Sequence, residues 1–228
     1  MNPGNDPSLP LEQQVSDPRA RIGDEVRTRL FATPGVIRLD DDRVDMFVLP
    51  DFVAPHDRHL LMEMIDRGAE PSPIFAAEGF ENHRTSSSCN FDRGDALTQR
   101  FDARFDDLLG LPNRSGETIQ AQRYAPGQHF GVHADFFFVD QPYWAQMEPL
   151  GGQRTWTAMV YLNEPEQGGA TLFPNLGIQF EPQAGQLLAW NNMNRDGAPN
   201  ALTMHQGCPV EAGMKYIITK WYREGNWY

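Results

Sequence analysis

The sequence is poor in cysteine, in basic residues and in long apolar runs. Its 228 residues include only two cysteines, Cys89 and Cys208, too few for a disulfide scaffold or, by themselves, for a zinc site. No apolar stretch approaches the ~20 residues of a membrane-spanning helix. The polar first residues show no secretory signal, so we expect a cytoplasmic protein with free thiols and no membrane partner. The 31 acidic residues outnumber the 19 basic ones, which argues against a nucleic-acid partner.

The organisation of the chain changes twice along its length. Residues 1–17 are polar and proline-rich, which predicts a loose tail, and a short helix is expected over residues 18–30. We therefore expect an N-terminal tail or extension over residues 1–43 and a single domain over residues 44–228.

Helices precede strands within the expected domain. A first strand is expected over residues 44–49, and apolar residues at helical spacing predict amphipathic helices opening at Pro55 and spanning 96–109. After residue 117, short β-rich runs alternate with Gly, Pro and Asn turns; these runs span 118–124, 154–162, 170–173, 178–181, 186–190 and 215–222. This order predicts a mainly β fold with packed helices (α+β), a sandwich or jelly roll whose helices support one sheet.

The pair His133 and Asp135 is the first candidate for chemistry. Residues two apart on a strand point to the same face, so the two side chains can share a metal ion, although such a pair also occurs on surface turns. With a distant His205 they would form the two-histidine, one-carboxylate triad of non-haem iron oxygenases. His129 is a rival third ligand, and catalytic zinc in a hydrolase uses similar ligand sets.

Lys215 is the second candidate. The run from residue 215 to 222 is apolar on both faces, which is typical of a strand buried on both sides, so one lysine is expected to point inward. A buried ammonium group needs an anionic partner. Either a carboxylate of the protein or a carboxylate of a ligand would meet this need.

Four ordered segments resemble a known family. They are RTSSS (84–88), QRYAPGQHFGVHADFF (122–137), GGQRTWTAMVYLNEPEQGGATLFPNLG (151–177) and HQGCPVEAGMKYIITKWYRE (205–224). From about Val44 to Arg223 the chain resembles the prolyl 4-hydroxylases, within the iron(II)/2-oxoglutarate dioxygenases.

The resemblance implies a double-stranded β-helix that uses Fe(II), with 2-oxoglutarate and O2 as cosubstrates and ascorbate as a reductant. It implies that His133, Asp135 and His205 bind the iron, which favours His205 over His129. It also implies that Lys215 pairs with the distal carboxylate of 2-oxoglutarate. Three further residues match positions near the cosubstrate in relatives: Tyr124, Tyr161 and Thr171.

The resemblance also implies a substrate, a proline within a peptide or protein. Five residues match positions tied to peptide binding or to the shape of the site: Arg84, Ser86, Glu117, Arg154 and Trp221. Two departures put the substrate in doubt, since Phe130 stands where relatives often carry Tyr, and Arg223 replaces a residue that can be His.

Two alternatives to the hydroxylation of a peptide or protein remain open. The same chemistry on a free amino acid or other small molecule is one alternative, and a non-catalytic metal-binding sensing module is the other. We expect a monomer or homodimer. Residues 136–144, directly after the ligand pair, are expected to form a mobile lid.

Overall fold

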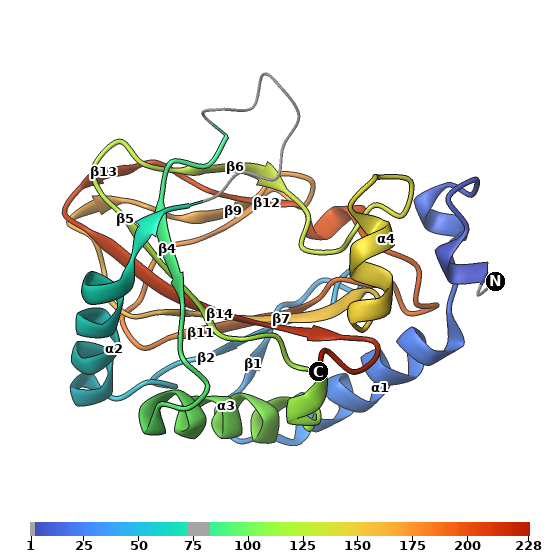
Figure 1. Cartoon of the computed structure of the whole chain (residues 1–228), viewed down its shortest axis with the longest axis horizontal. Coiled ribbons are helices and arrows are strands. Elements are labelled where there is room, and N and C mark those ends of the chain that lie inside the picture. Colours follow the sequence, from blue (N-terminus) through green and yellow to red (C-terminus); the bar gives the residue numbers. More distant parts are fainter. Residues whose placement is uncertain (1–2, 73–82) are drawn as a thin grey trace.

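Two antiparallel sheets face each other at the centre of the protein, in a computed structural model that describes residues 3–72 and 83–228 (Figure 1). The larger sheet has eight strands. In spatial order these are β1 (Ile37–Arg38), β2 (Met46–Leu49), β11 (Leu187–Asn191), β7 (Arg154–Tyr161), β14 (Lys215–Arg223), β5 (Gln120–Tyr124), β4 (Ser87–Asn90) and β3 (Glu70–Pro71).

The smaller sheet has four strands. Their order is β10 (Ile178–Phe180), β9 (Thr171–Phe173), β12 (His205–Gly207) and β6 (Phe130–His133). A further two-stranded sheet pairs β13 (Val210–Ala212) with β8 (Gln167–Gly168). The two facing sheets, connected in this non-sequential order, form the jelly-roll core of a double-stranded β-helix, as predicted.

Three long helices lie along the face of the large sheet that is turned away from the small sheet (Figure 1). They are α1 (Asp17–Ala32), α2 (Pro55–Gly68) and α3 (Ala96–Leu109), and a short helix, α4 (Trp144–Met147), follows β6. The local sequence sets the bounds of α3. Asp95 caps its start by accepting from the backbone N–H groups of Leu97 and Thr98, and Gly110, at φ 68°, ends it in the left-handed region.

The strand β14 separates two apolar cores. Ile218 and Tyr222 point toward the helices and pack with α3 residues such as Phe101 and Phe105. Ile217 points the other way, into the apolar cluster between the two sheets. Because side chains alternate along a strand, Lys215 belongs to the face between the sheets and Lys220 to the helix face.

The structure confirms the predicted helix over 96–109 and places the other two predicted helices at α1 and α2. The six strand runs predicted after residue 117 correspond to β5, β7, β9, β10, β11 and β14, with ends that differ by at most two residues. The sequence did not predict the shorter strands that carry His133 and His205. None of the helices in the described part of the chain is both long enough and apolar enough to cross a bilayer.

The expected loose segment over residues 1–17 differs from the structure. The described part of this segment is held by Arg19, which is fully buried in α1. Its guanidinium group donates to the carbonyl oxygens of Gly4, Gln14 and Gly197. A buried arginine on the neighbouring helix thus supplies the order that the polar composition of the segment does not predict. The division of the chain near residue 43 stays a prediction.

Candidate metal centre and cosubstrate site

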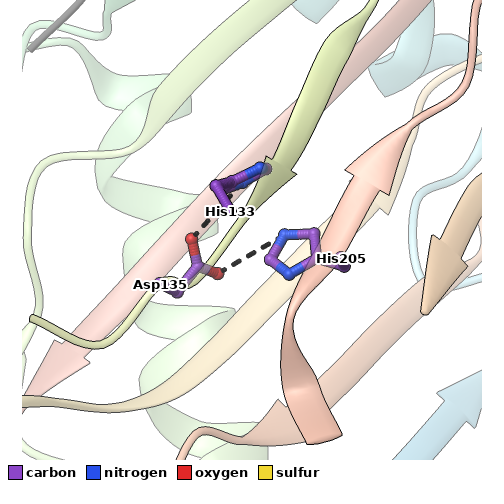
Figure 2. Close-up of side chains that lie close together, drawn as sticks. All are labelled: His133, Asp135 and His205. Atoms are coloured by element: carbon purple, nitrogen blue, oxygen red, sulfur yellow. Dashed lines mark ion pairs between the residues drawn. The ribbon is translucent and has the colours of Figure 1, made fainter. Parts of the chain in front are cut away.

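His133 and His205 meet across two paired strands. His133 ends β6 and His205 begins β12, and the two residues are directly opposite each other in the antiparallel register. Their ring centroids are 4.3 Å apart. Asp135 lies just beyond β6, and one atom from each of the three side chains lies within 4.8 Å of the other two (Figure 2). Among the described residues this is the one such group, and the rival ligand His129 is not part of it.

Backbone carbonyl groups orient both imidazoles. Nδ1 of His133 lies 2.9 Å from the carbonyl oxygen of Gly131, and Nδ1 of His205 lies 3.0 Å from that of Thr203. A carbonyl oxygen can only accept, so each Nδ1 carries the proton and donates. Each Nε2 therefore keeps a free lone pair, and both Nε2 atoms face the Asp135 carboxylate, at 4.0 and 3.9 Å.

The Asp135 carboxylate is buried and is oriented by a hydroxyl group. Thr157 donates to Oδ2 of Asp135 at 2.7 Å, and the side-chain amide of Asn192 donates to Thr157 at 2.9 Å. Thr157 and Asn192 are fully buried, on and just after strands of the large sheet. The sequence analysis missed both residues, because only the tertiary fold brings β7 and β11 behind the ligand group.

The electrostatics of the three side chains favour a bound cation. Burial lowers the pKa of His133 to about 3, with a further contribution from His205, so this imidazole is neutral at pH 7. Burial raises the pKa of Asp135, but His205, His133 and Arg154 outweigh this effect and hold it below its ordinary value. A buried carboxylate facing a neutral imidazole lacks a counterion, and two imidazoles with one carboxylate suit Fe(II).

Lys215 is buried, with 1% of its surface exposed, and forms no ion pair with any described carboxylate. Its ammonium group lies between two aromatic rings, 5.2 Å from the centroid of Tyr124 and 5.5 Å from that of Tyr161. Burial lowers the pKa of Lys215 to about 8. The alternative of a protein carboxylate as partner is therefore not realised among the described residues, which leaves the anion of a ligand.

Tyr161 and Thr171 form one polar contact beside Lys215. The Tyr161 hydroxyl donates to Oγ1 of Thr171 at 2.7 Å, and both residues are buried. Tyr124, which lies opposite Lys215 on β5, donates to the side-chain oxygen of Gln122. The apolar cluster around Tyr124 and Tyr161 also contains Phe173 and Trp190, whose rings flank His205. The candidate cosubstrate residues and the metal ligands thus border the same space between the sheets.

The carboxylate of Glu117 joins Arg154, another candidate substrate residue, to Arg223. Arg154 forms a two-pronged pair with the Glu117 carboxylate, at 2.6 and 2.8 Å, and Nε of Arg223 donates to the same carboxylate. Burial raises the pKa of Glu117, but both arginines more than reverse this effect and hold it below its ordinary value. The guanidinium of Arg154 also stacks 4.1 Å from the ring of Trp221. Arg223, noted in the sequence only as a departure, is a buried member of this cluster.

Arg84, the remaining candidate arginine, contacts different partners from those of this cluster. It donates to Ser86 at 3.2 Å and to the side-chain oxygen of Gln120 at 3.0 Å. Its guanidinium lies 4.8 Å from the Phe130 ring, which stacks on His133 at 3.7 Å. Phe130, where relatives often carry Tyr, therefore packs directly on a candidate metal ligand.

The segment after Asp135 packs inward. Phe136, Val139 and Trp144 are buried, and the side-chain amide of Gln153 binds both the backbone N–H and the carbonyl oxygen of Phe137. Gln153 is fully buried and was not among the residues predicted from the sequence. Its two bonds fix the chain two residues beyond Asp135, so a mobile lid over 136–144 stays a prediction.

The sequence matches the 2OG-Fe(II) oxygenase superfamily over residues 119–223. It is 34% identical over 131 residues to prolyl 4-hydroxylase subunit alpha-2 of Caenorhabditis elegans, which covers 57% of this chain and 24% of that protein. It is 28% identical over 218 residues to probable prolyl 4-hydroxylase 4 of Arabidopsis thaliana, which covers 84% of this chain and 72% of that protein. The chain spans about a quarter to a third of the length of the animal subunits it matches, 24% and 35% in two cases.

Solved structures share the fold. A viral collagen prolyl hydroxylase from Paramecium Bursaria Chlorella virus-1 matches with a TM-score of 0.61 and 24% identity, over 77% of this chain and 94% of that one. A prolyl hydroxylase from Trichoplax adhaerens, solved with a hypoxia inducible factor peptide, matches with a TM-score of 0.59 and 18% identity, over 96% of both chains. At these identities the likeness shows the jelly-roll fold.

Proposed function

Because this chain belongs to the 2OG-Fe(II) oxygenase superfamily, and within it to the prolyl 4-hydroxylase family, we propose that it hydroxylates proline in a peptide or protein, using iron(II), 2-oxoglutarate and O2. One observation carries the proposal. Two histidines and a buried carboxylate converge at one end of the inter-sheet space, and a buried lysine without a described ion-pair partner borders the same space. We assign this activity to the domain expected over residues 44–228.

The three ligands would hold the metal through Nε2 of His133, Nε2 of His205 and the Asp135 carboxylate. The carbonyl groups of Gly131 and Thr203 keep both Nε2 lone pairs available. Thr157 restrains the carboxylate through one of its oxygens. These contacts preorganise the site, because the chain fixes the ligand orientations before a metal arrives.

Lys215 would bind the distal carboxylate of 2-oxoglutarate. An ammonium–carboxylate contact in a buried site is a charge-assisted hydrogen bond, which contributes roughly 1.5–3 kcal/mol. Tyr124, Tyr161 and Thr171 would bound the same pocket, with the Tyr161 hydroxyl already oriented by Thr171. The rings around Lys215 and His205 would exclude water from the cosubstrate.

When bound, iron(II) and 2-oxoglutarate supply the oxidising chemistry, with release of succinate and CO2 and transfer of one oxygen atom to a substrate C–H bond. The protein contributes binding, orientation and a dry site. Glu117, Arg154 and Trp221 would shape the substrate side, together with Arg84 and Ser86. Ascorbate as reductant, a cytoplasmic location and a monomer or homodimer stay predictions from the sequence.

A non-catalytic sensing module is not favoured. A metal-binding module without turnover has no need for a buried ammonium group that lacks an ion-pair partner among the described residues, and burial of such a group is costly. The same chemistry on a free amino acid or small molecule keeps every assigned role in the metal and cosubstrate sites. Selectivity between a peptide and a small-molecule substrate must therefore come from the residues on the substrate side.

The test is succinate formation from 2-oxoglutarate with purified protein, Fe(II) and O2, in the presence of proline-rich peptides or of free proline. We expect succinate that depends on iron and O2, and a mass increase of about 16 Da, one oxygen atom, on the peptides. Succinate without any peptide modification would contradict the proposed substrate. No succinate under any condition would contradict the proposed enzyme.

A His133→Ala variant is the companion test. It removes one metal ligand, so we expect loss of bound iron and of succinate formation with an unchanged fold, measured by metal content and circular dichroism. His56→Ala, on the outer helix α2, is the matched control and should keep both. Full metal content in the His133 variant would contradict the ligand assignment.

A further inference from the structure

The charges on the substrate side of the site do not balance. Three arginines approach this region, Arg84, Arg154 and Arg223, and Glu117 is the one carboxylate with which any of them forms an ion pair among the described residues. Arg154 and Arg223 share that carboxylate. Asp135 also interacts electrostatically with Arg84 and Arg154, but it belongs to the proposed metal site. The carboxylate of Glu224 also acts on Arg223, but it forms its own ion pair with the fully buried Arg19. Two positive charges are thus left without a carboxylate.

The cosubstrate does not supply the missing anion. In the loaded site of the proposed function, the two charges of the metal and the one of Lys215 are matched by Asp135 and by the two carboxylates of 2-oxoglutarate. The loaded centre is therefore neutral, and the surplus charge of the arginines persists. Since desolvated charges without partners are costly, this surplus favours a substrate that brings negative charge.

Arg84 is the arginine best placed to meet that charge. Its described hydrogen-bond acceptors, Ser86 and Gln120, are both neutral, and Nη1 donates to no described atom. Burial lowers its pKa, which shows the cost of the unmatched charge, while the group stays protonated at neutral pH. The guanidinium stacks on Phe130, which itself stacks on His133, so it lies one aromatic ring away from a metal ligand.

We propose that the substrate carries a carboxylate close to the proline that is hydroxylated, and that Arg84 binds this carboxylate. The inference rests on the proposed function and adds the chemical class of its substrate. The net charge of −12 would repel acidic molecules from most of the surface, so local arginine contacts must decide the selectivity. Arg154, already bound to both oxygens of Glu117, acts on the same substrate mainly by shaping the wall with Trp221.

The carboxylate has two chemical sources, and matched peptides separate them. One is an acidic side chain next to the proline, tested by a capped peptide with Glu beside Pro against the same peptide with Gln. The other is the end of a chain, tested by a peptide ending in proline with a free carboxylate against its amide, with free proline as the smallest case. Affinities are measured by calorimetry under nitrogen, with Fe(II) and 2-oxoglutarate present, so that no turnover occurs.

We expect at least one acid-bearing peptide to bind roughly ten- to a hundredfold more tightly than its neutral partner, the range of a charge-assisted contact. Arg84→Gln should remove this difference, and Arg84→Lys should restore part of it. Arg67→Gln changes the same charge on an exposed part of α2 and should keep the full difference. The neutral peptides should bind Arg67→Gln and the parent protein with similar affinity.

Equal affinities within each pair, including no detectable binding of any peptide, would overturn the inference. So would a preference for the acid-bearing peptide that survives in Arg84→Gln. The proposed function has a separate readout, succinate formation in air. Succinate formation with equal affinities would refute the carboxylate alone, whereas absent succinate with selective binding would refute the oxygenase and leave the anion site.

Discussion

At the scale of single residues, the site is defined by what each polar group lacks. Asp135 is a buried carboxylate beside the neutral imidazole of His133, and Lys215 is a buried ammonium without an ion-pair partner among the described residues. Most buried charges in proteins are paired, so two unpaired ones in a shared space indicate ligands of opposite charge. A cation beside Asp135 and an anion beside Lys215 satisfy both.

We expect the pH dependence of 2-oxoglutarate binding to follow the titration of Lys215. Burial lowers its pKa from 10.5 to about 8 in the folded protein. The ammonium form, which binds a carboxylate, is lost as the pH rises through about 8, so we expect the affinity for 2-oxoglutarate to fall there. Without ligand, the stability of the folded protein changes in the opposite direction and rises with pH. The folded protein must hold a buried charge below pH 8, and this cost disappears between about 8 and 10.5.

The measurement is 2-oxoglutarate titration from pH 6.5 to 9.5 with the parent protein and with Lys215→Met. The variant should need far more 2-oxoglutarate at pH 7, keep its bound iron, and show no affinity change through pH 8. A flat pH profile in the parent protein, or unchanged 2-oxoglutarate dependence in the variant, would contradict the assigned role.

At the scale of elements, each face of β14 buries one lysine, and the two lysines have different surroundings. Lys215 points between the sheets toward the proposed cosubstrate, whereas Lys220 points toward the helices and forms a 2.6 Å ion pair with Asp102 of α3. Strand alternation alone produces this division. One lysine therefore faces the proposed cosubstrate site, and the other ties the strand to the helix layer.

The Lys220–Asp102 pair predicts a stability effect of its own. Asp102→Asn leaves a fully buried ammonium group without its counterion, so we expect about 3–5 kcal/mol of destabilisation in denaturant unfolding. Asp107→Asn, an exposed position on the same helix, should change stability by less than about 0.5 kcal/mol. Adding Lys220→Met to the Asp102 variant should recover much of the loss. A small effect of Asp102→Asn alone would show that the pair is not buried as described.

Arg19 predicts a second effect, on the N-terminal segment. Arg19→Ala leaves the carbonyl groups of Gly4, Gln14 and Gly197 without their donor, so we expect about 2–3 kcal/mol of destabilisation. Limited proteolysis should then cut the segment before α1 earlier than in the parent protein. Arg21→Ala, exposed on the same helix, is the control. Equal proteolysis of the two variants would contradict the anchoring role of Arg19.

At the scale of the whole molecule, the proposed metal site is an addition to a core that is complete without it. The ligand-bearing strands are paired to each other and to β9, and both apolar clusters are closed by side chains alone. We therefore expect a chelator to abolish succinate formation without unfolding the protein, in contrast to small zinc domains that need their metal to fold.

Circular dichroism and thermal unfolding with and without chelator check this expectation. The β-sheet signal should persist, and Fe(II) should restore activity. The melting temperature should fall only as far as the lost free energy of metal binding accounts for. Loss of the sheet signal on chelation would show that the metal is part of the folding core.

Much of this protein follows from local sequence. Apolar spacing and the Asp95 and Gly110 caps determine α3, and β-rich runs between turn residues determine the long strands of the large sheet. His133 and Asp135 are adjacent enough in the chain for their shared face to be predicted, and Lys215 stands out as a charge in an apolar strand. The resemblance of four ordered segments added His205 and the cosubstrate residues.

Tertiary structure decided what depends on distant parts of the chain meeting. The short strands that carry both histidines are too brief for a period of two to be detected, and pairing fixes them only once the sheets form. The sequence alone does not distinguish five residues from ordinary polar ones: Thr157, Asn192, Gln153, and the Glu117 and Arg223 that pair with each other. They acquire roles because burial removes water as their partner, so each must bond to whatever the fold places beside it.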